Sequence, residues 1–144
     1  MDANKLSEAC QREIEDLHAF FVGWFRGTLP DTEEAWARAA QVMAPAFSLI
    51  APSGARSSRA ELLPALRALH GSRANEVFEI WTKNFELVLV GADQISARYE
   101  EWQRIGEAVR SRISSAIFVR DADAPHGVAW LAVHETWLPL NDDG

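Results

Sequence analysis

Four long segments in the second half of the chain alternate between apolar and polar residues and are separated by turn-forming sequences. The segments span residues 76–90, 94–104, 108–120 and 127–139. Alternation with a period of two is typical of β-strands, and short turns such as Gly-Ala-Asp at 91–93 and the turn around Gly106 join antiparallel neighbours. The sequence therefore predicts a run of long antiparallel strands, and the rest of the chain must cover one face of it.

The first half of the chain predicts three helices and a short hairpin. The first and third predicted helices span residues 5–26 and 58–70, and the second runs from a cap at Asp31 through Met43 until Pro45 stops it. A strand at 46–50 has its hairpin partner at 55–57. The first helix has an apolar stripe at three- and four-residue spacing, and Gly27 is placed to end it. Asp31 with Glu34 three residues later forms a capping pattern for the second helix, and Ser58 is a cap for the third.

The turns also predict how the strands pair. Placing Val90 opposite Gln94 gives one apolar face and one face with opposite charges across the strands. The resulting pairs are Leu89–Ile95, Leu87–Ala97, Phe85–Tyr99, Lys83–Glu101 and Glu86–Arg98. Placing Arg104 opposite Ala108 puts Ser115 on the face of Tyr99 and puts Arg112 beside Glu100. A slip of one residue at this turn would exchange the two faces of the strand.

The closing segment is rich in apolar groups on both faces. One face carries Val128, Trp130, Ala132, His134, Thr136 and Leu138, and the other carries Ala129, Leu131, Val133, Glu135 and Trp137. Helices can cover only one face of such a sheet. We therefore expect the other face to meet a second copy of the chain.

Composition narrows the class of protein. The net charge is -7, and Lys and Arg are scattered, so the basic footprint of a nucleic-acid-binding protein is missing. The one cysteine, Cys10, suits a reducing compartment, where it would act as a small buried apolar residue. The sequence has neither a leader pattern nor 18 consecutive apolar residues. These features predict a single cytoplasmic domain over residues 1–144 that contacts neither nucleic acid nor membrane.

Three helices followed by a long bent sheet resemble the nuclear-transport-factor-2-like (NTF2-like) superfamily, and more narrowly its SnoaL-like and association-domain-like members of unknown function. The segments that carry the resemblance are residues 20–25, 69–72, 99–103, 114–120 and 133–139. The resemblance implies an α+β cystatin-like fold, in which N-terminal helices pack on a strongly curved antiparallel sheet to form a cone with an internal pocket. It also implies a small-molecule ligand between the first helix and the concave face, and a homodimer through the convex face.

A catalytic site in such a cone needs a titratable group in an apolar pocket, because desolvation moves its pKa toward neutrality. His134 is the candidate general base, with Glu101 or Tyr99 as its proton partner. The candidate ligand-binding residues are Trp24, Phe85, Ser115, Trp130 and Thr136. Each candidate catalytic residue also has a structural interpretation. His134 could be a core histidine that is hydrogen-bonded to a neighbour, Glu101 could pair with Lys83 across the strands, and Tyr99 could be an aromatic side chain packed in the core.

The candidate site changes if the other face of the closing strand is the concave one. If Glu135 and Trp137 face inward, the candidates become Glu135, Arg98, Trp102 and Arg112. The superfamily's steroid isomerases carry a tyrosine on the first helix, and this helix has none, which argues against their mechanism. The four histidines are too dispersed for a metal site, and we expect neither a metal nor a cofactor.

The predicted function is therefore a homodimeric small-molecule-binding domain. One alternative is a cofactor-independent lyase or isomerase with His134 as general base. The other is an association module whose pocket has no ligand.

Overall fold

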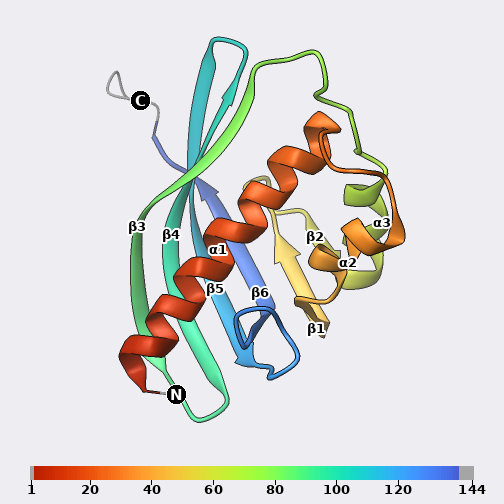
Figure 1. Ribbon diagram of the computed structural model, residues 1–144. Coiled ribbons are helices and arrows are strands. Elements are labelled where there is room, and N and C mark those ends of the chain that lie inside the picture. Colours follow the sequence, from red (N-terminus) through yellow and green to blue (C-terminus); the bar gives the residue numbers. More distant parts are fainter. Residues whose placement is uncertain (1, 140–144) are drawn as a thin grey trace.

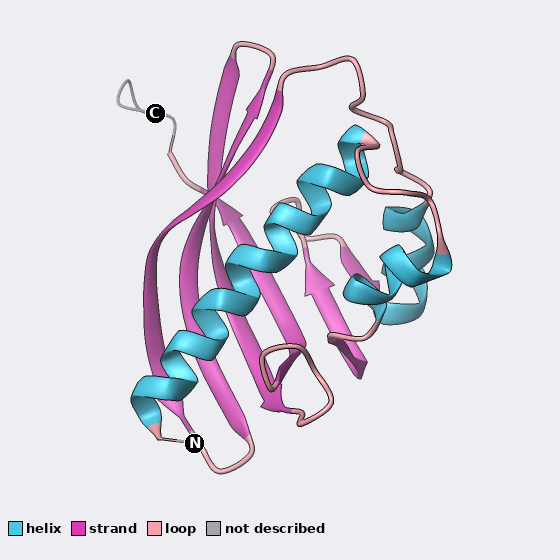
Figure 2. Cartoon of the chain, in the orientation of Figure 1, coloured by secondary structure: helices cyan, strands magenta, loops and turns pink. Residues whose placement is uncertain are grey.

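The computed structural model describes residues 2–139, and these form three helices packed on one six-stranded sheet (Figures 1 and 2). The elements are α1 (Ala3–Arg26), α2 (Glu33–Ala40), β1 (Met43–Ile50), β2 (Arg56–Ser58), α3 (Arg59–Arg67), β3 (Phe78–Val90), β4 (Gln94–Ile105), β5 (Ala108–Arg120) and β6 (Val128–Trp137). The expected α+β class is confirmed. The expectation of a purely antiparallel sheet is corrected, because β1 pairs with β6 in parallel in the order β2-β1-β6-β5-β4-β3.

Helix α1 lies diagonally across one face of the sheet, and α2 and α3 lie beside its C-terminal half (Figure 1). Gly27 ends α1 in the left-handed conformation, with φ of 75°, as its position in the sequence predicts. The N-terminal cap of α2 lies one residue later than expected, because the side chain of Thr32, and not that of Asp31, accepts a hydrogen bond from the backbone N–H of Ala35. Ser58 caps α3 through a reciprocal pair of hydrogen bonds with Glu61.

Two expected helix ends are wrong. Helix α2 stops at Ala40 well before Pro45, which lies inside β1, and α3 stops at Arg67 instead of continuing to His70. The strand and hairpin partner expected at 46–50 and 55–57 correspond to β1 and β2, with Leu49 opposite Ser57.

The pairing of β3 with β4 is partly as predicted. Leu87–Ala97 and Glu86–Arg98 are confirmed, but Leu89 faces Ser96 and Lys83 faces Glu100, so the expected Leu89–Ile95 and Lys83–Glu101 pairs are wrong. The register shifts between Lys83 and Glu86 and again between Leu87 and Leu89. Asn84 lies at the first shift and has a φ of 55°, a conformation that breaks a regular ladder.

The pairing of β4 with β5 is one residue away from the prediction. The turn contains only Gly106 and Glu107, so Ile105 faces Ala108, and Arg104 does not. The slip exchanges the two faces of β5. Arg112 therefore faces Glu101 instead of Glu100, and Ser115 lies on the face opposite to Tyr99.

A bulge in β6 changes which of its side chains point inward. Phe118 pairs with Trp130 and Ile117 pairs with Ala132, which leaves Leu131 as an extra residue in the strand. The alternation therefore shifts by one after Trp130. Trp130 and Glu135 are buried on the helix side, whereas His134 is exposed, so the expected inward position of His134 is corrected.

Candidate functional site

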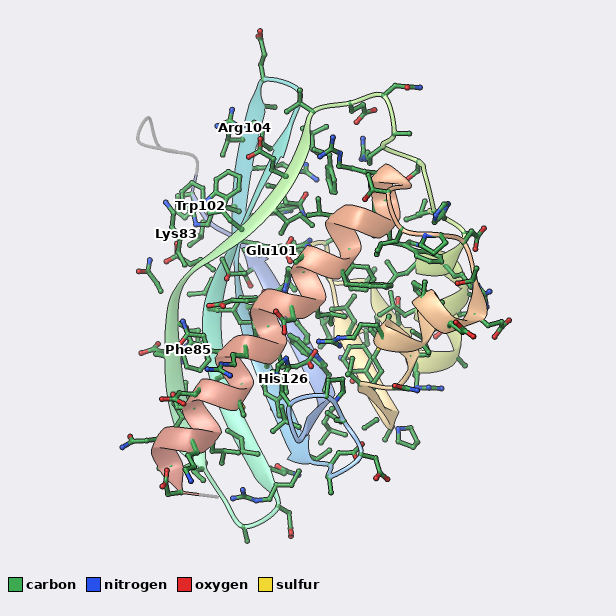
Figure 3. The ribbon with its side chains drawn as sticks, viewed as in Figure 1. Lys83, Phe85, Glu101, Trp102, Arg104 and His126 are labelled. Carbon is green, nitrogen blue, oxygen red and sulfur yellow. The ribbon has the colours of Figure 1, made fainter. Side chains whose placement is uncertain are left out.

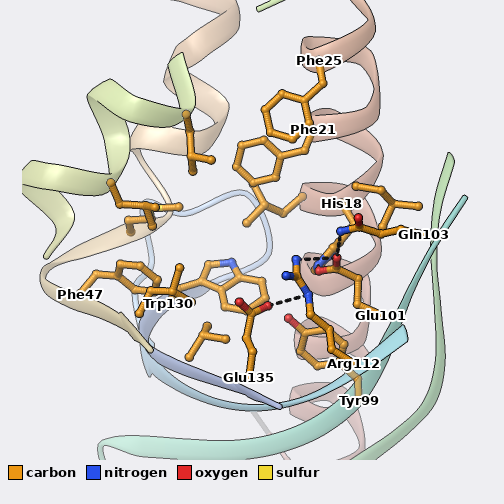
Figure 4. Close-up of a pocket in the computed structure, with 17 residues that line it drawn as sticks. His18, Phe21, Phe25, Phe47, Tyr99, Glu101, Gln103, Arg112, Trp130 and Glu135 are labelled. Atoms are coloured by element: carbon orange, nitrogen blue, oxygen red, sulfur yellow. Dashed lines mark hydrogen bonds and ion pairs between the residues drawn. The ribbon is translucent and has the colours of Figure 1, made fainter. Parts of the chain in front are cut away.

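A pocket lies between α1 and α3 on one side and the helix-facing side of the sheet, β1 included, on the other (Figure 4). Its volume is about 150 Å³. Eleven of its 17 lining residues are aliphatic, Phe, Trp or Met. The other six lining residues carry polar groups, gather at one end and are His18, Tyr99, Glu101, Gln103, Arg112 and Glu135.

The apolar walls come from elements far apart in the sequence. Phe21 and Phe25 follow His18 on the buried stripe of α1, Phe47 comes from β1, and Leu62 and Leu66 come from α3. Because these side chains cover one end of the pocket and the charged groups lie at the other, the pocket has an apolar body and a polar end (Figure 4).

Trp130 of β6 forms part of the wall and is fixed by a buried carboxylate. Its Nε1–H donates to Glu13 Oε2 at 2.9 Å. Arg38 of α2 binds both oxygens of Glu13, at 2.9 and 3.2 Å, and Glu13 itself is fully buried. The Glu13 carboxylate thus ties α1, α2 and β6 together and holds the indole in place.

His18 is buried at the polar end and is held at both ring nitrogens. Nδ1 lies 2.6 Å from the carbonyl oxygen of Ile14, and Nε2 lies 2.8 Å from Glu101 Oε1. Both oxygens are acceptors, so both ring nitrogens must donate, and this arrangement requires the imidazolium. Burial alone lowers the pKa of His18, but the hydrogen bond and charge of Glu101 raise it above the ordinary value.

Glu101 is the most strongly bound group of the cluster. Its Oε2 accepts hydrogen bonds from Gln103 at 2.5 Å and from Arg112 at 2.6 Å, and its Oε1 faces His18. Burial by itself raises the pKa of Glu101, yet the hydrogen bond and charge of His18 and the charge of Arg112 hold that pKa at about 2. Glu101 is therefore ionised across the ordinary pH range and orients its neighbours.

Glu135 differs from Glu101 in both its contacts and its ionisation. Its Oε2 lies 2.9 Å from Arg112 Nε, but the N–H is not aligned with that oxygen as a hydrogen bond requires. Burial raises the pKa of Glu135 to about 7, since the nearby charge of Glu101 also raises it and Arg112 offsets only part of the shift. Glu135 therefore changes its charge near neutral pH.

Tyr99 packs beside this cluster as a neutral phenol. Its ring meets His18 edge to face, with the ring centroids 5.5 Å apart. Burial and the charges of Glu101 and Glu135 raise the pKa of Tyr99 well above its ordinary value.

The structure brings three of the eight predicted site residues to the pocket: Tyr99, Glu101 and Trp130. Trp24 and Phe85 pack in the core instead, and the Trp24 indole donates to the carbonyl oxygen of Arg67 at 3.2 Å. Ser115, His134 and Thr136 are exposed and lie outside the pocket.

The alternative concave face predicted two of the remaining pocket residues. Glu135 and Arg112 line the pocket, as that alternative expected, whereas Arg98 and Trp102 do not. Figure 3 shows Trp102 and Lys83 on the side of the sheet away from α1, and Lys83 Nζ lies 4.1 Å from the Trp102 ring centroid.

Sequence reasoning missed His18 and Gln103 as site residues. His18 lies four residues after Ile14 on the buried stripe of α1, a position that signals a buried polar group. Gln103 follows Glu101 by two residues in β4, so it shares the same face of the strand.

Within residues 2–139, no group of three or more His, Cys, Asp or Glu side chains is arranged to hold a metal ion. His126 lies in the loop between β5 and β6, near α1 (Figure 3), and its Nε2 contacts Asp16 at 2.6 Å. Among the described helices, none is long and apolar enough to cross a membrane.

Comparison with known proteins identifies relatives of this chain. A family model described as "Sucrose-6-phosphate phosphohydrolase C-terminal" matches residues 10–139. Sucrose-phosphatase 2 of Nicotiana tabacum is 28% identical over 127 residues, which are 88% of this chain and 30% of that protein. Probable sucrose-phosphatase 2 of Arabidopsis thaliana is 22% identical over 125 residues, or 87% and 29% of the two chains. The chain thus spans about 30% of the length of these curated relatives.

Solved structures share the fold. An NTF-2-like protein of unknown function from Pseudomonas aeruginosa is 24% identical with a TM-score of 0.80, over 91% of this chain and 99% of that chain. A protein with a cystatin-like fold from Caulobacter vibrioides is 17% identical with a TM-score of 0.62, over 94% and 90% of the two chains. These likenesses confirm the NTF2-like, cystatin-like fold.

Proposed function

Given that the chain belongs to the sucrose-6-phosphate phosphohydrolase C-terminal family, we propose that it is a small-molecule-binding domain whose ligand occupies the pocket between α1 and the concave face of the sheet. The observation that carries this proposal is that polar groups at one end of the pocket lack hydrogen-bond partners. Arg112 and Glu135 line the pocket and meet only as an unaligned ion pair, with Glu135 Oε2 2.9 Å from Arg112 Nε, and within residues 2–139 no hydrogen bond reaches Arg112 Nη1 or either oxygen of Glu135. Polar groups inside a protein ordinarily have hydrogen-bond partners. Groups that lack a partner and line a pocket therefore favour a ligand or an ordered water as that partner.

The volume and lining of the pocket favour a compact, partly apolar ligand. Pockets for drug-sized molecules enclose roughly 300–1,000 Å³, whereas this one encloses about 150 Å³. The names of the curated relatives point to sucrose phosphate as an alternative ligand. A mostly apolar lining favours an aliphatic or aromatic body over a molecule covered with hydroxyl groups.

This proposal can be tested by filling the pocket. A panel of compact aliphatic and aromatic molecules, with sucrose and sucrose 6-phosphate included, is screened by ¹H–¹⁵N NMR for shifts of the backbone amides of pocket residues. Leu66→Trp adds bulk inside the pocket and is expected to abolish the shifts. Leu69→Trp, at an exposed site just beyond the same helix, is the matched control and should leave them unchanged.

Two results would contradict the proposal. One is that no member of the panel shifts the pocket amides, and the other is that the shifts persist in Leu66→Trp. A response to sucrose 6-phosphate alone would keep the domain as a ligand-binding module but overturn the compact, apolar ligand.

A second candidate function is proton transfer on a bound molecule by a cofactor-independent lyase or isomerase. Its specific support is Glu135, because a pocket carboxyl with a pKa of about 7 can both accept and donate a proton near neutrality. In this proposal Glu135 takes the role that the sequence assigned to His134. Wild-type protein should then catalyse deuterium exchange from solvent into small ketones that bind, and Glu135→Gln should not. Equal exchange in the two proteins would rule this function out.

We also propose that the chain forms a homodimer through the face of the sheet opposite to α1. Trp102, Ile113 and Ile117 are only partly buried there, although their side chains are large and largely apolar. Helix α1 covers the other face (Figure 2). Partly exposed apolar groups on a sheet face are typical of subunit contacts.

A further inference from the structure

The charges at the polar end of the pocket do not cancel when Glu135 is protonated. His18 and Arg112 are cations, and Glu101 is ionised. With Glu135 neutral, this cluster carries one net positive charge beside an apolar cavity. With Glu135 ionised, the cluster is neutral.

From this geometry we propose that the pocket binds a small monocarboxylate, whose carboxylate pairs with Arg112 while Glu135 takes up one proton from solvent. The inference rests on the proposed function and names the class of its ligand. The protonated Glu135 then donates its O–H to the ligand carboxylate, so the two carboxyl groups share one proton beside the guanidinium. The only covalent change is the transfer of one proton from solvent to the Glu135 carboxylate.

Arg112 is the group that can receive such an anion. Its Nη2 donates to Glu101 Oε2 at 2.6 Å and its Nε is shielded from solvent with Glu135 Oε2 2.9 Å away, but its Nη1 makes no hydrogen bond within residues 2–139. The side chain is 21% exposed, so it is open on one side. A ligand carboxylate at Nη1 would make a charge-assisted hydrogen bond there, beside the Glu135 carboxyl.

Charge balance favours a monoanion over a dianion. A phosphate monoester carries about two negative charges near neutral pH. The cluster offers one net positive charge at most, so a dianion would leave one charge uncompensated in a partly dehydrated site. The apolar body of the pocket, formed by Phe21, Phe47 and Leu62 among others, matches the alkyl or aryl group of a carboxylic acid.

The groups that face Glu135 explain why its proton responds to the ligand. Arg112 of β5 lowers its pKa, Glu101 of β4 raises it, and His18 of α1 lowers it. Tyr99 of β4 faces it as an uncharged phenol, and β1 and α3 contribute only apolar residues to this pocket. A second anion at Arg112 would add to the effect of Glu101, so the pKa of Glu135 must rise further when the ligand binds.

The experiment compares hexanoate with hexanamide, a neutral molecule of nearly the same shape. Binding to the whole chain is measured by isothermal titration calorimetry between pH 6 and pH 9. At pH 8 the titration is repeated in two buffers with different ionisation enthalpies, which reports the number of protons taken up. We expect hexanoate to bind at least about tenfold more tightly than hexanamide at pH 7. Above about pH 7, its dissociation constant should rise about tenfold per pH unit, and binding at pH 8 should take up close to one proton.

Two variants separate the roles of the residues. Glu135→Gln cannot ionise, so it should bind hexanoate with an affinity that no longer falls with pH, and without proton uptake. His134→Gln changes the neighbouring residue on the opposite face and should behave as wild type. Hexanamide binding as tightly as hexanoate, or hexanoate binding without proton uptake at pH 8, would overturn the inference and leave the pocket itself intact.

If hexanoate does not bind at millimolar concentration, the inference is also overturned. The proposed function fails only if the wider panel of compact molecules shifts no pocket amide as well. The two failures are therefore distinguishable.

Discussion

Glu135 Oε2 lies 2.9 Å from Arg112 Nε without forming an aligned hydrogen bond, at the polar end of a mostly apolar pocket. Arg112 is shared between this carboxylate and Glu101, which receives the shorter and better aligned contact. One carboxylate is thereby held ionised, and the other is left to titrate near neutral pH.

The first prediction concerns stability and pH. The folded pKa of Glu135 lies at about 7, above the ordinary value of 4.5. The folded state therefore holds this proton more tightly than the unfolded state, and the resulting stability is present below pH 4.5 and is lost as pH rises toward 7. The loss is about 3 kcal/mol. Urea unfolding from pH 5 to pH 8 should show a decline in wild type that is smaller in Glu135→Gln by about this amount. Parallel profiles would mean that Glu135 has an ordinary pKa.

The second prediction concerns Arg112, whose removal leaves two buried carboxylates without their shared cation. Arg112→Gln should lower the free energy of unfolding by about 3 kcal/mol at pH 8, and by less at pH 5, where Glu135 holds its proton. Arg110→Gln is the control, because Arg110 stacks on Trp137 at 4.4 Å and should cost less than about 1 kcal/mol. Similar losses in the two variants, measured by urea unfolding, would show that the charge cluster does not depend on Arg112.

The third prediction separates two neighbours on β6. His134 is exposed and Glu135 is buried. His134→Ala should change the free energy of unfolding by no more than about 0.5 kcal/mol and should leave ligand-induced shifts of the pocket amides intact. Glu135→Ala should alter those shifts, because it removes a pocket side chain. A loss of the shifts in His134→Ala would place the site on the opposite face of the sheet.

The fourth prediction concerns the homodimer. Ile113→Lys introduces a charge into the partly buried convex face and is expected to give a monomer by light scattering at concentrations where wild type is a dimer. Glu107→Lys introduces the same charge in the exposed turn between β4 and β5 and should leave the dimer intact. A wild-type protein that stays monomeric at about 100 μM would contradict the proposed interface.

The long elements of this fold could be predicted because their signals are local. Period-two alternation and short turns locate β3 to β6 closely, and the apolar stripe with Gly27 defines α1. The parallel pairing of β1 with β6 could not be predicted, since no local pattern specifies which distant strand completes a sheet.

The site was harder to predict because it depends on which of the two faces of the sheet each strand residue points to. A two-residue turn at Gly106 and an extra residue at Leu131 each shift a strand by one position. Together these shifts turn Arg112 and Glu135 inward and Ser115 and His134 outward. The sequence gives the residue types but does not specify the face on which each one lies. Turn length and bulges are set by tertiary packing, so a single sequence leaves them open.

The most direct test of the site is the titration of Glu135 itself, followed by ¹³C NMR of its side-chain carboxyl carbon and assigned by the loss of the signal in Glu135→Gln. The pocket described above predicts a midpoint near pH 7 without ligand and a higher midpoint in the presence of hexanoate. A midpoint near 4.5 that does not respond to hexanoate would contradict both the buried Arg112–Glu135 pair and the ligand class proposed for it.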